Sequence, residues 1–113
     1  MPRTTLTPKT LPDAYSKVPA TLVYTAGDPA NNHDVALTGR EFVICRNVGG
    51  TDQTITIISS NLNNRTGDST KLVPANSQVI FQNFPTAGWR QTNGKLNIDV
   101  DSANLELAVL KLP

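Results

Sequence analysis

Apolar and polar residues alternate with a period of two along much of the chain, the pattern of strands with one buried face. In KLNIDV, residues 95–100, the side chains of Leu96, Ile98 and Val100 point to one face and the polar side chains to the other. Residues 53–59, QTITIIS, mostly alternate in the same way. No stretch carries a convincing helical period, so the pattern predicts an all-β protein.

Turn residues separate the strand candidates at short intervals, as in small sandwiches and barrels. GGTD, between residues 41–48 and 53–59, has hairpin composition, and Asn93-Gly94 predicts a tight turn before residue 95. We therefore expect a single small antiparallel β-sandwich or barrel-like domain over residues 20–113. Its candidate strands are residues 20–26, 35–38, 41–48, 53–59, 77–84, 89–91, 95–100 and 105–113.

Residues 1–19 have a different pattern, rich in proline and threonine. Pro2, Pro8 and Pro12 interrupt the opening MPRTTLTPKTLP, and proline excludes a helix interior or a central strand. The stretch predicts an extended N-terminal arm that does not join the core. It is either a frayed terminus or a segment laid on another surface.

The last strand candidate is apolar on both faces and therefore needs cover on both. A small sandwich supplies one inner face. The second cover is either a loop of the same chain or a neighbouring subunit, and we favour the neighbour because exposed apolar patches usually mark interfaces. One face holds Leu105, Leu107 and Val109, and the candidate oligomer interface on the other holds Ala108, Leu110 and Leu112.

Charge and cysteine content narrow the classes of function. The net charge of +1 lacks the basic excess of a nucleic-acid-binding protein. Cys45 is the only cysteine, so no disulfide forms within the chain. We see neither a signal peptide nor a membrane-spanning stretch, and expect synthesis in a host cytoplasm and no membrane partner.

Candidate chemistry is sparse. Asp28, His33 and Asp34 share the polar stretch 27–34 and include ligand types for a metal, but such residues more often cap turns. We expect Cys45 to be a buried, inert thiol, and Trp89 to be a core or edge anchor rather than a sugar-binding platform. The sequence thus predicts no catalytic residue, no cofactor and no metal.

Five segments carry a resemblance to a known class of protein: TTLTPKTLP, GREFVICRNVGGTDQTITI, NRTGD, GWRQTNGKL and LAVLKLP. Together they resemble small structural proteins of tailed bacteriophages, above all capsid decoration, or cement, proteins. The resemblance implies a non-enzymatic protein on the capsid exterior of the virion, with the major capsid protein as partner. It also implies a homo-oligomer, with a trimer favoured. A neck or head–tail connector protein and a carbohydrate-binding or adhesion module are the alternatives.

The arm then has a candidate role. An extended, proline-restrained segment loses little entropy on docking and can add a strand to a sheet edge. We hypothesise that residues 1–12 staple the protein to a capsid subunit or to its own neighbour, and that their deletion leaves the fold intact. Arg3 and Lys9 would pair with acidic residues, Thr5 suits an extended edge, and Leu6 and Leu11 would fill apolar pockets.

Overall fold

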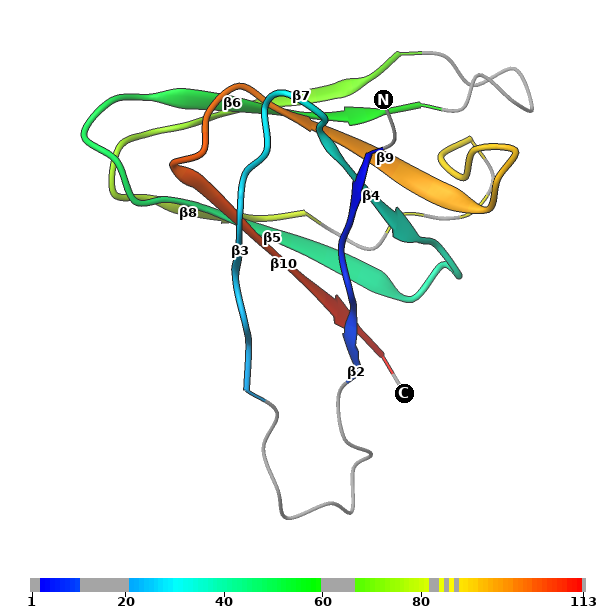
Figure 1. Ribbon diagram of the computed structural model, residues 1–113. Coiled ribbons are helices and arrows are strands. Elements are labelled where there is room, and N and C mark those ends of the chain that lie inside the picture. The colour runs from blue at the N-terminus through cyan, green and yellow to red at the C-terminus, as the bar shows by residue number, and fades with distance from the viewer. Residues whose placement is uncertain are drawn as a thin grey trace.

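The computed structural model describes residues 3–10, 21–59, 67–81, 84, 86 and 88–112. These residues form two sheets packed as a small β-sandwich, which confirms the all-β prediction (Figure 1). In the described part of the chain, no helix has the length and apolarity that crossing a membrane requires. The strands are β1 Thr4–Thr5, β2 Lys9–Thr10, β3 Thr25–Ala26, β4 His33–Ala36, β5 Glu41–Asn47, β6 Gln53–Ile58, β7 Ser69–Val73, β8 Gln78–Ile80, β9 Lys95–Val100 and β10 Leu105–Lys111.

The two sheets are mixed rather than purely antiparallel. Sheet A has the strand order β1-β4-β9-β6-β7, and sheet B has the order β2-β10-β5-β8, with β3 also paired to β10. The two short strands of the arm are the source of the parallel pairs, because β1 runs parallel to β4 and β2 runs parallel to β10. The other described pairs are antiparallel.

The core lies between the inward faces of the two sheets. The predicted alternation of β9 is confirmed, because Leu96, Ile98 and Val100 are all buried in the core. The inner face predicted for the last strand is confirmed in the same way. The facing core residues of sheet B are Val43, Cys45, Leu105, Leu107 and Val109.

The predicted hairpin over residues 41–59 is wrong. β5 pairs with β10 and β8 in sheet B, whereas β6 pairs with β7 and β9 in sheet A. Residues 48–52 therefore carry the chain from one sheet to the other. The buried amide of Asn47 holds this crossing by donating to the carbonyl oxygens of Thr51, at 2.7 Å, and Val73, at 3.0 Å.

Other segments also differ from expectation. Residues 69–73, which are not among the candidate strands, form β7, and in the candidate 77–84 the strand β8 covers only residues 78–80. In the strand candidate 20–26 only β3 is strand, and residue 20 lies outside the described residues. Residues 89–91 form no strand, because the amide of Arg90 donates back to Thr86 in a turn. The turn at Gly94 is confirmed, with a φ of 83°. His33, expected in a loop, opens β4.

Candidate functional site: the N-terminal arm and the outer face of sheet B

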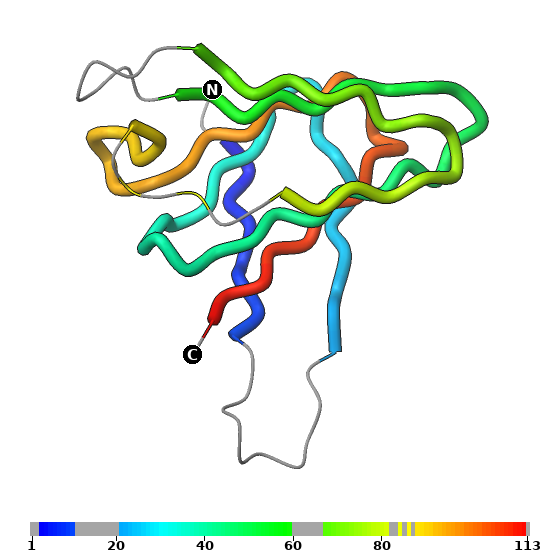
Figure 2. The backbone as a smooth tube through the Cα atoms, turned by 180° about the vertical axis from the view of Figure 1, so that it is seen from behind, coloured from blue at the N-terminus to red at the C-terminus, as the bar shows by residue number. Residues whose placement is uncertain are grey.

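The described part of the arm, residues 3–10, is bound along one side of the sandwich. The amide of Thr4 donates to the carbonyl of Asn32, and the amide of Leu6 donates to the carbonyl of Asp34, both at 2.8 Å. Beyond this point β2 continues along β10 in sheet B. The arm thus passes from the edge of one sheet to the edge of the other and joins them, as Figure 2 shows from behind.

Leu6 makes the arm part of the core. Its side chain is 4% exposed and belongs to the main apolar cluster, so the expectation that this segment stays out of the core is wrong. Prolines exclude a central strand but leave an edge segment free to direct one side chain inward. Lys9 is exposed in β2, and Leu11 lies outside the described residues.

Two further arm residues predicted to reach a partner bind their own chain here. The guanidinium of Arg3 lies 2.5 Å from a carboxylate oxygen of Asp99 and 3.2 Å from the carbonyl of His33. The hydroxyl of Thr5 donates to the carboxylate of Asp34 at 2.7 Å. The ion pair is partly exposed, so its contribution is below about 1 kcal/mol. These contacts fix the register of the arm on β4.

His33 is the buried centre of the arm's binding site. Its Nε2 accepts a hydrogen bond from the amide of Asp28 at 2.9 Å, and its Nδ1 lies 3.2 Å from the carbonyl of Thr4. This network assigns the proton to Nδ1, which donates to Thr4. Burial lowers the pKa of His33 more than the hydrogen bond to Thr4 and the nearby carboxylates raise it. The neutral ring therefore joins the arm to the loop before β4.

Asp28 orders the turn beside this histidine. Its carboxylate accepts from the hydroxyl of Thr4 at 2.6 Å and from the backbone and side-chain amides of Asn31, both at 3.2 Å. The bonds from Thr4 and Asn31 lower the pKa of Asp28. Asp28 thus caps a turn, the role that its residue type favours. The described residues contain no group of three or more His, Cys, Asp or Glu side chains placed to hold a metal ion.

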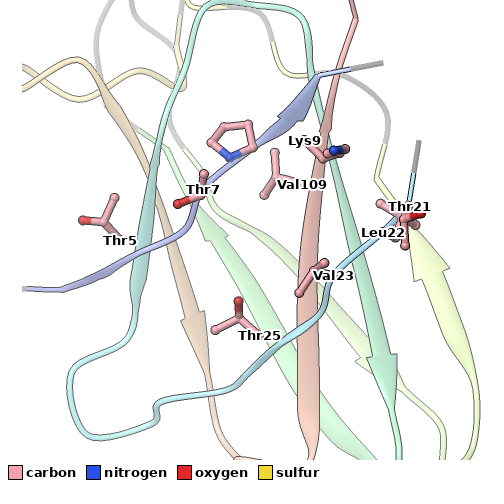
Figure 3. A pocket seen from close by; sticks show the side chains of 9 residues that line it. Thr5, Thr7, Lys9, Thr21, Leu22, Val23, Thr25 and Val109 are labelled. Carbon is pink, nitrogen blue, oxygen red and sulfur yellow. The ribbon is translucent and has the colours of Figure 1, made fainter. Parts of the chain in front are cut away.

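A groove of about 280 Å³ separates the arm from residues 21–25, which lead into β3, and both β2 and β3 pair with β10 (Figure 3). Thr7 and Lys9 line one wall, Val23 and Thr25 line the other, and Val109 contributes from β10. Val23 is 76% exposed. The groove therefore presents methyl groups, hydroxyl groups and one cation.

The outer face of sheet B carries a second set of apolar side chains, which we call the outer band. β5, β8 and β10 contribute to it through the cross-strand pairs Ile44–Ile80, Ile44–Ala108 and Phe42–Leu110. The band consists of Phe42, Ile44, Ile80, Ala108, Leu110 and Leu112.

Burial divides the outer band into a covered centre and an open rim. Ile44 and Ala108 are 2% and 4% exposed although they lie outside the main core cluster, so the chain itself covers them. Leu110 is half-buried, Leu112 is 38% exposed and Ile80 is 63% exposed. Of the predicted interface residues Ala108, Leu110 and Leu112, Ala108 is thus covered within its own chain, and the exposed Ile80 is not among them. The signal for Ile80 was the alternation of β8, where Val79 packs on the core.

A polar cluster borders the outer band on the same face. The guanidinium of Arg46 stacks 3.7 Å from the ring centroid of Tyr24 and pairs with Glu106 at 2.7 Å. The hydroxyl of Tyr24 also donates to the side-chain oxygen of Gln78 at 3.4 Å. Tyr24, which precedes β3, therefore reaches across the outer side of sheet B towards its far strand.

The remaining candidate residues are structural. Cys45 is fully buried in β5, and burial raises the pKa of its thiol to about 12, so the predicted inert thiol is confirmed. Trp89 packs against the core, with its ring edge-on to Phe84 at 4.9 Å between centroids. It is thus the core anchor that its position after a glycine turn predicts.

We compared the chain with protein-family models, with curated proteins and with solved structures, and none of the three comparisons yields a match.

Proposed function

We propose that this chain is a structural protein of a tailed-bacteriophage virion, a capsid decoration protein that binds the outside of the assembled head and bridges subunits of the major capsid protein. The observation that carries the proposal is the outer band, because it is an apolar surface additional to a complete core. Exposed apolar surface of this kind usually marks an interface. The resemblance of the five sequence segments to phage structural proteins supports the same class.

Ile80 and Leu112 give the surface its adhesive character. Both side chains are large, apolar and open to solvent, whereas Ile44 and Ala108 of the same band are covered. Burying the exposed part of each against a partner contributes on the order of 1 kcal/mol. A head lattice offers many equivalent positions, and an oligomer such as a trimer makes several such contacts at once, so weak contacts combine into stable attachment.

The proposed mechanism is mass action on the assembled shell. A protein that binds the assembled lattice but not its free subunits stabilises the lattice by an amount that grows with its concentration relative to its Kd. Heads that carry the protein should therefore melt at a higher temperature than bare heads of the same phage. Equal melting temperatures would contradict a cementing role.

The direct test is sedimentation of the purified protein with heads from a phage that lacks it. Ile80→Asp puts a charge on the rim of the outer band, and Leu72→Asp puts the same charge on an apolar residue of similar exposure, 51%, on β7 of sheet A. We expect Ile80→Asp to weaken binding by about tenfold or more, which is about 1.4 kcal/mol, and Leu72→Asp to bind like the wild type. Equal binding by both variants, or no binding of the wild type, would overturn the proposal.

A further inference from the structure

We propose that His33 is a proton-operated latch for the N-terminal arm, which holds residues 3–6 on β4 while its ring is neutral and releases them when the ring gains a second proton. This inference concerns the arm alone and does not rest on attachment to a capsid. It starts from the position of the ring, which is fully buried between the arm and the loop before β4.

Both ring nitrogens of His33 are hydrogen-bonded, one as a donor and the other as an acceptor. Nδ1 faces the carbonyl oxygen of Thr4, which only accepts, and Nε2 faces the backbone amide of Asp28, which only donates. Only the neutral tautomer with its proton on Nδ1 satisfies both partners. A proton on Nε2 sets two N–H groups against each other at 2.9 Å, so the contact must open.

None of the carboxylates around the ring is positioned to accept a hydrogen bond from a protonated Nε2. Asp28 is taken by Thr4 and Asn31, and Asp34 of β4 is taken by Thr5 and by the ammonium of Lys95 at 3.6 Å. From the arm, the cation of Arg3 opposes a second positive charge.

The last charged group near the ring is Asp99 of β9, the strand that pairs with β4, and it neutralises Arg3. The charged ring thus has no acceptor for Nε2 in place. Its Nδ1 can still donate to Thr4, so the buried charge and the lost contact with Asp28 oppose docking, and release of the arm exposes the ring to water.

This latch acts at the attachment of β1 to β4. The ring bond to Thr4 lies between the two backbone bonds that hold β1 on β4, from Thr4 to Asn32 and from Leu6 to Asp34. Release of these bonds exposes the edge of β4 and the site that Leu6 fills, a sheet edge that can accept another extended segment.

The direction with pH follows from linkage. Burial in the docked structure lowers the pKa of His33 from its ordinary value of 6.5, although the bond to Thr4 opposes this, so protonation disfavours the docked arm. Docking is therefore complete above that value and weakens as the pH falls below it, by up to about tenfold per pH unit for one linked proton. His33 is the only histidine in the chain, which makes the assignment unambiguous.

The test is amide hydrogen exchange at pH 7.5 and 5.5, corrected for the intrinsic rates. We expect the protection of the Thr4 and Leu6 amides to fall by up to about tenfold relative to the β5 amide of Val43. Two variants provide the matched comparison. His33→Gln removes the titration, so its arm protection should not change with pH. Thr4→Ala loses the hydroxyl bond to Asp28 but keeps the carbonyl, so its arm is less protected at both pH values with the wild-type ratio between them.

Three outcomes would overturn the latch. They are wild-type arm protection that is independent of pH, the full pH response in His33→Gln, or a pH ratio in Thr4→Ala that differs from the wild type. If His33→Gln does not fold, an NMR titration of the imidazole in the wild type decides. A midpoint below 6.5 that the Thr4 and Leu6 amides follow supports the latch, and a midpoint at or above 6.5 excludes it.

Discussion

Glu41, the first residue of β5, is a buried carboxylate with every oxygen bonded. Oε1 accepts from the backbone amides of Thr38, Gly39 and Arg40 at 2.8 to 3.2 Å, and Oε2 accepts from the hydroxyl of Thr38 at 2.7 Å. Burial favours the neutral acid, but these hydrogen bonds outweigh it and lower the pKa of Glu41. One side chain thus fixes the turn that leads into the central strand of sheet B.

Glu41→Gln should lower the free energy of unfolding by about 2 to 3 kcal/mol at pH 7, because the new amide group faces donors that then lack an acceptor. The pKa of Glu41 is lower in the folded than in the unfolded chain, where it is near 4.5. Its stabilisation is therefore complete above 4.5 and is lost as the pH falls through the folded-state value. Urea unfolding at pH 7 and at pH 3.5 measures this difference.

The matched control for Glu41 is Glu106→Gln, which removes the partly exposed carboxylate that pairs with Arg46. Exposed ion pairs contribute little, so this variant should cost less than about 1 kcal/mol. The explanation fails if both variants cost the same, or if the gap between Glu41→Gln and the wild type is as wide at pH 3.5 as at pH 7.

At this scale the sequence predicts residues whose environment depends on local alternation. The burial of Cys45 and of Ile98 follows from the period of two in their own strands. The role of His33 could not be predicted in this way, because its partner Thr4 lies 29 residues away along the chain. The burial of Leu6 could not be predicted for the same reason, since the core residues around it come from strands that follow it in sequence.

The crossing between β5 and β6 shows where element prediction stops. Residues 49–52 have the composition of a tight hairpin, and the flanking segments are correctly predicted as strands. Turn residues allow the chain to reverse but do not decide whether the next strand pairs with the last or joins the opposite sheet. Here the hydrogen bonds of Asn47 to Thr51 and Val73 support the second arrangement.

A substitution at Gly27 tests how closely the chain after β3 approaches the connection between β9 and β10. A Cβ added at Gly27 would lie 2.5 Å from the carbonyl oxygen of Ser102 and 2.7 Å from that of Leu105. Both are backbone atoms, so Gly27→Ala must displace β3 or the connection, at a cost of roughly 1 to 3 kcal/mol. A Cβ at Gly50 meets nothing within 4 Å, so Gly50→Ala should be neutral or slightly stabilising. Thermal unfolding of both variants checks this, and equal melting temperatures would contradict it.

For the molecule as a whole, the sequence predicts the sandwich but not the pairing of the N-terminal arm with the edges of both sheets. Alternating strands and regular turns are sufficient for two packed sheets with one core. The parallel pairing of β1 with β4 and of β2 with β10 has no local signal, because two-residue strands carry no period. The outer band was partly predictable from the two apolar faces of the last strand, whereas its members Ile44 and Ile80 required the register of β5, β8 and β10.

The sequence analysis expects the fold to survive deletion of the arm, but the packing of the arm on the sandwich predicts that its loss destabilises the fold. Because Leu6 is buried in the core, Leu6→Ala should lower the free energy of unfolding by about 2 to 4 kcal/mol. Thr7→Ala, at an exposed position of the same arm, should change it by less than about 0.5 kcal/mol. Urea unfolding of the two variants gives both values.

Deletion of residues 1–10 should destabilise the chain more than Leu6→Ala, because it also removes the arm's ion pair with Asp99 and its backbone bonds to β4. Unfolding measured at two protein concentrations separates the possible sites of docking. An arm bound within its own chain gives the same loss at both concentrations, whereas an arm bound to a second copy gives a loss that depends on concentration. A deletion without effect at either concentration would show that Leu6 contributes nothing to this core, and the arm could then serve only a partner.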